Sequence, residues 1–208
     1  PGRIIVSMKT RSDLDATITA LGQGDRMTAD EVHQLVDGVL AGDVDLDAFG
    51  RWLVALADAG ETAAEIAGVA ASLRARMVPL EAGLPDDTLV ADTCGTGGDG
   101  SGSFNISTAA AIVVAAAGQP VAKHGNRAVS SRTGSADVLA ALGVGTDAPI
   151  ETAAKCLPEV GLCFCFAPAH HPAMARVGPL RRSLGRPTVF NLVGPLCNPA
   201  SARVQVIG

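Results

Sequence analysis

Strand-like segments alternate with helical segments through the second half of the chain, and this alternation constrains the fold more than any other feature. Short apolar runs at 88–94, 119–125 and 162–168 are each followed by a segment with helical spacing or caps. Strands joined through helices predict a parallel sheet with right-handed crossovers. A further strand is expected at 202–208, and a parallel sheet should continue with another helix. We therefore expect an α/β domain that is C-terminally incomplete.

Helical periodicity dominates residues 12–77 instead. Two capping boxes, in which a Thr precedes a Glu by three residues, open helices at Thr28 and Thr62. Apolar residues follow at the spacing of one helical face. A third helix is expected between them, starting at Asp45 or Asp47. Three short helices with short links predict an all-α unit.

The composition changes at 78–88, "VPLEAGLPDDT", where two prolines, a glycine and two aspartates indicate a hinge or linker. We therefore predict an N-terminal helical domain, 1–78, hinged to a parallel-sheet α/β domain, 79–208. Within the second domain, 169–186 is expected to be helical and to pack near the hinge, with a break at Gly178 and Pro179.

Composition excludes several function classes. The formal net charge is −5, from 16 basic and 21 acidic residues, so the chain has no global attraction to nucleic acid or anionic membrane. The longest apolar run, Ala109–Ala117, is far shorter than the ~20 residues of a spanning helix. Five Cys, an odd number, predict free thiols in a reducing cytoplasm. Cys163 and Cys165 are interpreted as buried strand residues rather than as a metal pair.

The segment "DTCGTGGDGSGSFNIST" contains a G-x-G-x-x-G pattern at 95–100. A dinucleotide loop is disfavoured, because Asp99 would repel pyrophosphate and the next helix begins several residues too late. No Asp or Glu lies about 20 residues beyond the loop to hold a ribose. A P-loop is also disfavoured, because Ser101 stands where Lys is required.

A phosphate site at the start of the next helix remains. Asn105, Ser107 and Thr108 and the free backbone N–H groups of the first turn could bind phosphate. The Ser107 hydroxyl could also bind a phosphate-bound Mg²⁺, and Asp99 could contact ribose hydroxyls or the metal shell. The simpler alternative is that Ser107 or Thr108 only caps the helix.

A second loop, "KHGNRAVSSRTGSADVL", follows the next expected strand. Lys123, His124, Arg127 and Arg132 concentrate positive charge in ten residues of an acidic protein. Ligands of doubly wound sheets bind beyond the carboxyl ends of the strands, so the two loops should be neighbours and favour an anion. A basic cluster by itself is more often a solvated surface. Ser135 is expected to cap the helix that follows.

Three motifs together resemble the anthranilate phosphoribosyltransferase family of tryptophan biosynthesis: "GTGGDGSGSFNIST", "KHGNRAVSSRTGSADVL" and "HHPAMARVGPLRRSLGRPTVFNLVGPLCNP". The resemblance covers roughly 28–208. It implies an enzyme, a pentosyltransferase that moves phosphoribosyl from 5-phosphoribosyl 1-diphosphate (PRPP) to the amine of anthranilate, releasing pyrophosphate. It also implies Mg²⁺, a homodimer formed through the helical domain, and no nucleic-acid or membrane partner.

Site residues follow from the same resemblance, by motif position. Arg181 and Asn126 would contact anthranilate together with Gly95, His124 and His171, and Ser107 would bind Mg²⁺. Further Mg²⁺ ligands would lie beyond residue 208, which leaves the activity of these 208 residues alone open. The residues expected to bind PRPP are Gly95, Gly98, Asp99, Ser103, Asn105, Ile106, Ser107, Thr108, Lys123, Asn126, Arg127, Ala128, Val129, Ser130, Ser131 and Ser135.

Two alternatives stay open at this point. A pyrimidine nucleoside phosphorylase of related fold would split a nucleoside with phosphate, although "KHGNRAVSS" does not match the phosphate loop it needs. A non-catalytic relative could bind nucleic acid or another partner. The acidic balance and the presence of Asn126 and Arg181 weigh against that second alternative.

Overall fold

The computed structural model of the chain describes residues 10–96, 103–128 and 133–208. The chain divides into two compact units, which are described one at a time. The helical unit contains residues up to Arg76 and the segment Ala173–Val193, and the α/β unit contains Met77–Pro172 and Gly194–Gly208. Among the described helices, none combines the length and hydropathy needed to cross a bilayer.

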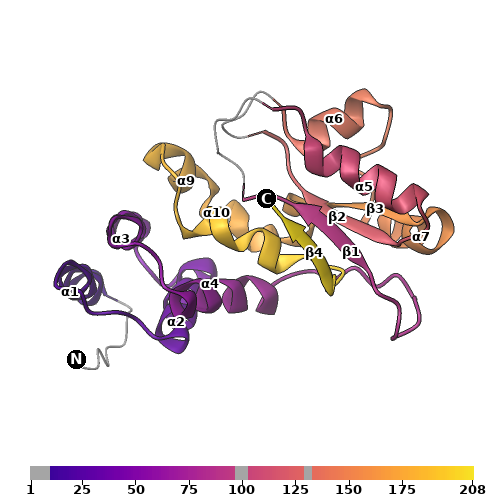
Figure 1. The fold of residues 1–208 in the computed structure, drawn as a ribbon. Helices are drawn as coiled ribbons and strands as arrows, with labels where there is room; N and C mark the ends of the chain where they lie inside the picture. The colour runs from indigo at the N-terminus through magenta and orange to yellow at the C-terminus, as the bar shows by residue number, and fades with distance from the viewer. Residues whose placement is uncertain (1–9, 97–102, 129–132) are drawn as a thin grey trace. The chain divides into compact units, whose positions relative to one another are not determined.

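Four α-helices form the body of the helical unit: α1 (Arg11–Gly22), α2 (Ala29–Ala41), α3 (Leu46–Ala59) and α4 (Ala63–Ala75) (Figure 1). The capping boxes predicted at Thr28 and Thr62 are confirmed, and Asp45 rather than Asp47 caps α3. The expected number of three helices is wrong. Helix α1 also begins with a capping box, at Thr10, where Asp takes the place of Glu.

The helical unit is not continuous in sequence. Helices α9 (Gly178–Leu184) and α10 (Val189–Val193) join it, with α9 packing on α3 and α10 on α4 and α3. Phe190 of α10 meets the ring of Phe49 edge-on, with centroids 6.3 Å apart. The expected unbroken domain at 79–208 therefore differs from the observed partition. Apolar side chains of this segment find their partners on α3, which sequence periodicity does not reveal.

The α/β unit contains a parallel sheet, as predicted. Its four described strands lie in the order β3 (Leu162–Phe166), β2 (Val121–Gly125), β1 (Ala91–Cys94) and β4 (Val204–Ile207). Every pairing is parallel. The carboxyl ends of β1 and β2 therefore lie at one edge of the sheet, where the two predicted loops begin.

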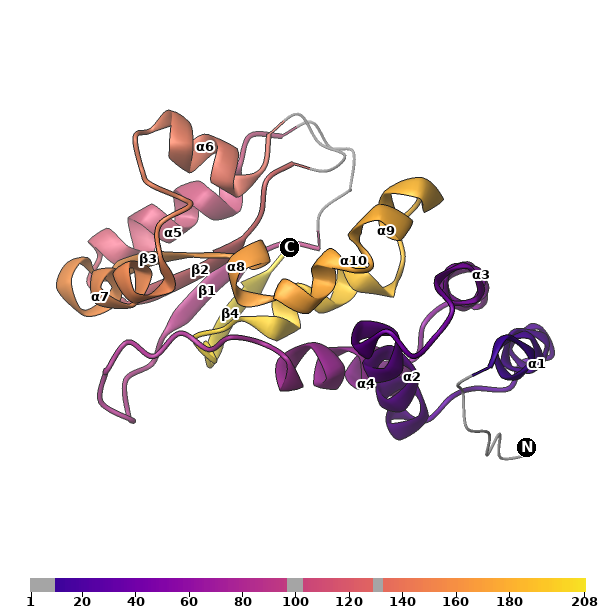
Figure 2. The same cartoon turned by 180° about the vertical axis from the view of Figure 1, so that it is seen from behind.

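Helices cover opposite faces of this sheet (Figures 1 and 2). Ala111 of α5 (Ile106–Ala116) packs with Ala91 and Val121 on one face. Leu157 of α7 (Ile150–Val160) packs with Ala122 and Cys165 on the other. Since successive strand residues alternate between faces, Lys123 follows Val121 to the α5 face. His124 follows Ala122 to the α7 face.

Several predicted boundaries shift in the structure. Ser135 is the first residue of α6 (Ser135–Ala141) and not its cap, because Gly134 occupies the N-cap position. Strand β3 ends at Phe166 and leads directly into α8 (Ala167–His170). The expected break before Pro179 is confirmed, since a 3₁₀ turn at Pro172–Ala175 precedes α9. The segment 186–200 contains α10 and a second 3₁₀ turn at Pro195–Cys197.

Gly68 on α4 is expected to be essential for the packing of α4 against α2. A Cβ there would lie 2.4 Å from the carbonyl oxygen of Ala29 and 2.8 Å from the Cβ of Val32. Gly68→Ala should therefore destabilise the helical unit by about 1–3 kcal/mol. Urea denaturation followed by fluorescence of Trp52, the single Trp, measures this. Gly22→Ala is the matched control, because a Cβ at Gly22 meets nothing within 4 Å, and equal losses in both variants would contradict the argument.

Candidate functional site

Lys123 lies at the carboxyl edge of the sheet with its charge largely removed from solvent. The side chain is 3% exposed, and Nζ donates to the carbonyl oxygen of Thr93 at 2.7 Å. Thr93 Oγ1 in turn donates to the carbonyl oxygen of Ser107 at 2.6 Å, which ties the end of β1 to the first turn of α5. Burial lowers the pKa of Lys123, and the negative charge of Asp92 partly opposes this. An ammonium has three donors, so two remain for an anion.

The first turn of α5 carries the other predicted phosphate ligands. Asn105 is the N-cap residue, so neither Ser107 nor Thr108 caps this helix, and that simpler alternative is wrong. The Asn105 side chain makes no capping bond and donates instead to Thr133 Oγ1 at 3.0 Å, across to the second loop. Of the first three N–H groups of α5, those of Ile106 and Thr108 donate to the carbonyl oxygens of Phe104 and Asn105 at 2.7 and 3.1 Å, which leaves the N–H of Ser107 for an anion.

Two acidic residues, Asp137 and Asp147, bind the described part of the second loop. Arg127 pairs with Asp147 at 2.9 Å and Asp137 at 3.7 Å. Asp137 also accepts the backbone N–H groups of Ala128 and Gly134, which hold the pKa of its carboxyl below the usual value. The Arg127 side chain and the Ala128 N–H therefore already have protein partners.

Asn126 and Ser135 lie together at the base of this loop. Ser135 Oγ donates to the carbonyl oxygen of Asn126 at 3.3 Å, and the exposed Asn126 side chain accepts the N–H of Arg127 at 2.8 Å. Gly125 sits in a close fit, since a Cβ there would lie 2.1 Å from Ser135 Oγ. The structure thus brings together the described part of this motif.

His124 and His171 form a buried imidazole pair on the other face of the sheet. Their ring centroids are 5.2 Å apart, and the two side chains belong to residues that are 8% exposed. His124 Nδ1 donates to the carbonyl oxygen of Gly194 at 3.3 Å, and His171 Nε2 donates to that of Cys197 at 3.1 Å. The opposite nitrogens, His124 Nε2 and His171 Nδ1, are buried with no partner among the described residues.

Both imidazoles are neutral. Burial, followed by the neighbouring His171, lowers the pKa of His124 to about 3, and burial likewise lowers the pKa of His171. Because each carbonyl partner fixes the proton on one nitrogen, the remaining nitrogen carries a lone pair. The pair therefore contains two buried acceptor nitrogens that no described residue satisfies.

Asp92 is a buried carboxylate next to Lys123 and His124 on the neighbouring strand, and the sequence analysis did not single it out. Its carboxylate is 1% exposed and accepts the N–H of His124 at 3.2 Å and the amide of Gln205 at 3.4 Å. Gln205 also donates to the carbonyl oxygen of Pro195 at 2.7 Å. Asp92 thereby links β1, β2 and β4. The available signal was an acidic residue inside the apolar run "TLVADTC".

Arg181 belongs to the helical unit. Its guanidinium carbon lies 5.2 Å from the ring centroid of Phe190. Among the described residues no carboxylate forms an ion pair with it. Burial lowers the pKa of its guanidinium, which nevertheless stays charged at neutral pH. A partly buried cation without a carboxylate partner is suited to an anionic ligand.

The remaining predicted residues lie at the margins of the described chain. Gly95 is exposed just after β1, Ser103 is exposed before α5, and Ile106 is the first residue of that helix, 57% exposed. Five predicted PRPP ligands fall outside the described residues: Gly98, Asp99, Val129, Ser130 and Ser131.

The described residues do not complete a Mg²⁺ site. The Ser107 hydroxyl is an oxygen donor of the kind Mg²⁺ prefers. No group of three or more His, Cys, Asp or Glu within 10–96, 103–128 and 133–208 could hold a metal ion. The buried Cys163 and Cys165, whose sulfurs are 4.0 Å apart, are therefore not part of such a group.

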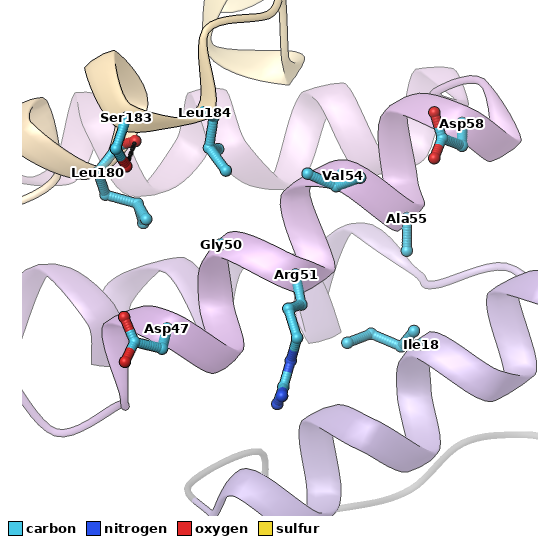
Figure 3. Close-up of a pocket in the computed structure, with 10 residues that line it drawn as sticks. All are labelled: Ile18, Asp47, Gly50, Arg51, Val54, Ala55, Asp58, Leu180, Ser183 and Leu184. Carbon is cyan, nitrogen blue, oxygen red and sulfur yellow. Dashed lines mark hydrogen bonds between the residues drawn. The ribbon is translucent and has the colours of Figure 1, made fainter.

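A hollow of about 570 Å³ in the helical unit contains none of the predicted site residues. Helices α1, α3 and α9 line it with apolar side chains such as Ile18, Val54 and Leu184 (Figure 3). Two of its charged residues are already paired, Arg51 with Asp15 at 2.7 Å and Asp58 with Arg186 at 2.6 Å. Its chemistry does not resemble that of the sheet edge.

Two protein-family models match the two parts of this chain. Residues 87–208 match the model described as glycosyl transferase family, a/b domain, and residues 16–77 match the helical bundle domain of the same family. The chain belongs to this glycosyl transferase family. The match over 16–77 lies within the helical unit, whereas the match over 87–208 contains the four described strands together with 173–193, which the structure assigns to the helical unit.

Individual relatives of this chain carry a more specific name than the family does. The anthranilate phosphoribosyltransferase of Novosphingobium aromaticivorans is 54% identical over 178 residues, which are 86% of this chain and 53% of that protein. The enzyme of the same name from Afipia carboxidovorans is 48% identical over 95% of this chain and 57% of its own length. The chain thus spans little more than half the length of these curated relatives.

Solved structures agree with this relationship. The anthranilate phosphoribosyltransferase of Thermus thermophilus has a TM-score of 0.83 at 45% identity, over 92% of this chain and 57% of that one. The Saccharomyces cerevisiae enzyme in complex with PRPP and Mg has a TM-score of 0.82 at 28% identity, over 96% of this chain and 59% of that one. A variant of the yeast enzyme was solved with 4-fluoroanthranilate.

Proposed function

We propose that the protein containing this chain transfers phosphoribosyl from PRPP to the amine of anthranilate, giving N-(5-phosphoribosyl)anthranilate and pyrophosphate in tryptophan biosynthesis. The observation that carries the proposal is the buried Lys123 beside the uncapped start of α5. Relatives that are named anthranilate phosphoribosyltransferase and are about 50% identical to this chain support the substrate assignment. A reducing cytoplasm is proposed as its location.

Phosphate binding is proposed for the α5 side of the sheet edge. The Lys123 ammonium would pair with a phosphate or diphosphate oxygen, and the N–H of Ser107 in the first turn of α5 would donate to the same anion. Asn105, Ser107 and Thr108 supply further polar groups there. The Asn126–Ser135 contact would set the second loop beside the ligand, with Arg127 serving to hold that loop through Asp147.

Anthranilate recognition is proposed for two sets of residues. The Arg181 guanidinium can pair bidentately with the carboxylate. The unprotonated ring nitrogens of His124 and His171 can accept hydrogen bonds from the N–H groups of the arylamine. A neutral arylamine is already a nucleophile, so these imidazoles would orient it rather than act as strong bases. Stabilisation of charge in a cation-like transition state would supply most of the barrier reduction.

Mg²⁺ is proposed as the metal, following the yeast enzyme solved with PRPP and Mg. Among the described residues Ser107 would be its ligand, together with phosphate oxygens of PRPP. When bound, the ion would neutralise the departing pyrophosphate.

The test of this function is a transfer assay with the native full-length protein. Loss of anthranilate fluorescence should require PRPP and Mg²⁺ together. Splitting of a nucleoside by phosphate without use of PRPP would instead show the phosphorylase alternative. Absence of both activities, with salt-sensitive nucleic-acid binding, would show the non-catalytic alternative.

Arg181→Lys should separate carboxylate recognition from phosphate binding. A lysine keeps the charge but loses the planar, bidentate donor pair. We expect KM for anthranilate to rise by roughly 10- to 100-fold, in line with a charged hydrogen bond of about 1.5–3 kcal/mol, while KM for PRPP changes little. Arg182→Lys, on the exposed neighbouring residue, is the control. Parallel rises in both KM values for Arg181→Lys would contradict the assigned role.

A homodimer formed through the helical unit is also proposed, from the family resemblance. Light scattering during size-exclusion chromatography of the native protein measures it. A mass equal to one chain across the working concentration range would contradict it.

A further inference from the structure

Arg181 is held by an aromatic ring rather than by an acid. Its guanidinium carbon lies 5.2 Å from the centroid of Phe190, a distance typical of a cation–π contact. Such a contact attracts the cation without using any of its N–H donors. An acidic partner would satisfy those donors and compete with a ligand carboxylate. The contact therefore fits a guanidinium whose donors must stay available.

The Phe190 ring is itself packed against a second aromatic ring. It is 4% exposed, and its ring meets that of Phe49 edge-on, with an interplanar angle of 71°. Phe49 stacks on Trp52 with centroids 5.4 Å apart, and the Trp52 indole N–H donates to the sulfur of Met27 at 3.2 Å. All of these residues belong to the helical unit. The ring below Arg181 is thus the outer member of a buried aromatic stack that leaves it little freedom.

We propose that Phe190 is a positioning residue that holds the Arg181 guanidinium, through its ring face, in the orientation that receives a substrate carboxylate. The proposal rests on the function proposed above. It predicts that loss of the ring weakens recognition of the carboxylate substrate selectively. A purely structural role would instead lower stability and affect both substrates alike.

The decisive variants are Phe190→Leu, Phe190→Tyr and Phe49→Leu in the native full-length protein. Leu is apolar but has no π face, whereas Tyr keeps the ring. Phe49→Leu removes a ring from the same stack while leaving the Phe190 ring against Arg181. For Phe190→Leu we expect KM for anthranilate to rise about tenfold, with KM for PRPP near the wild-type value. Phe190→Tyr should stay within about twofold of wild type, and Phe49→Leu should lower the melting temperature with a selective rise clearly smaller than that of Phe190→Leu.

A second measurement does not depend on turnover. A guanidinium over a ring face experiences the ring current, so the Hε resonance of Arg181 should lie upfield in the wild type and in Phe190→Tyr. It should move toward the usual arginine position in Phe190→Leu, with Arg181→Lys providing the assignment. An unchanged resonance in Phe190→Leu overturns the positioning role, as does an equal rise of anthranilate KM in Phe190→Leu and Phe49→Leu. A wild-type protein that shows the upfield resonance but no transfer refutes the proposed function alone.

Discussion

Replacing Lys123 with Met is expected to lower kcat/KM for PRPP by about 100-fold or more while leaving the protein as stable as before, or more stable. The loss follows from removing a buried charge aimed at an anion, which typically costs about 10²–10³ in rate. Lys123 is 3% exposed and its ammonium has one carbonyl partner, so two of its three donors are available to the anion.

The stability part of this prediction follows from the direction of the Lys123 pKa. Burial lowers that pKa, which means that the charged form is disfavoured in the folded state. Below the folded-state pKa the charged amine therefore subtracts from the free energy of unfolding, and Met of similar length removes that cost. Steady-state kinetics and thermal unfolding measure the two effects. Lys155→Met, on an exposed lysine of α7, is the control. A Lys123→Met protein with unchanged PRPP kinetics would remove the main support for the phosphate site.

Lowering the pH from 7 to 5 is expected to destabilise the α/β unit through its buried histidines. The folded-state pKa of His124 is about 3, and burial also lowers the pKa values of His170 and His171. The unfolded chain binds these protons near pH 6.5, and the folded chain binds them only at lower pH. Stability contributed by the neutral imidazoles is thus complete above pH 6.5 and falls as the pH drops toward the folded-state pKa values. For His124 the loss at pH 5 should be about 2 kcal/mol.

Variants that copy the observed tautomers isolate this effect. His124→Asn keeps a donor near the Nδ1 position toward Gly194, and His171→Gln keeps one near Nε2 toward Cys197. Each variant should reduce the number of protons taken up on unfolding by up to one. Urea denaturation between pH 5 and 7 measures the slope in a window above the titration range of Asp carboxyls. Unchanged slopes in both variants would show that the two imidazoles are not buried as neutral groups.

Local sequence signals predicted much of the fold. The capping boxes at Thr28 and Thr62 are local hydrogen-bond patterns, so they could be read from residue spacing and are confirmed. The alternation of strands and helices likewise predicted the parallel sheet. The N-cap of α5 was harder to predict. Asn105 takes that position while its side chain reaches Thr133 in the other loop, a contact set by tertiary structure.

The candidate site shows the same division. Sequence analysis placed Lys123 and His124 in one basic cluster, because it counted charge along the chain. In the structure the two side chains extend from opposite faces of β2, Lys123 toward Thr93 and α5 and His124 toward Gly194. Strand alternation could have indicated this separation. The partners of each face could not be predicted, because they come from distant segments.

The sequence by itself determined which residues cap its helices, that a helical region precedes a parallel sheet, and which polar residues follow the strands. Those properties depend on neighbours a few positions apart. Only the tertiary structure decided that 173–193 joins the helical unit, that Phe190 packs against Phe49, and that two backbone carbonyls orient the buried histidines. These contacts join segments far apart in the chain, and packing and burial select them rather than local spacing.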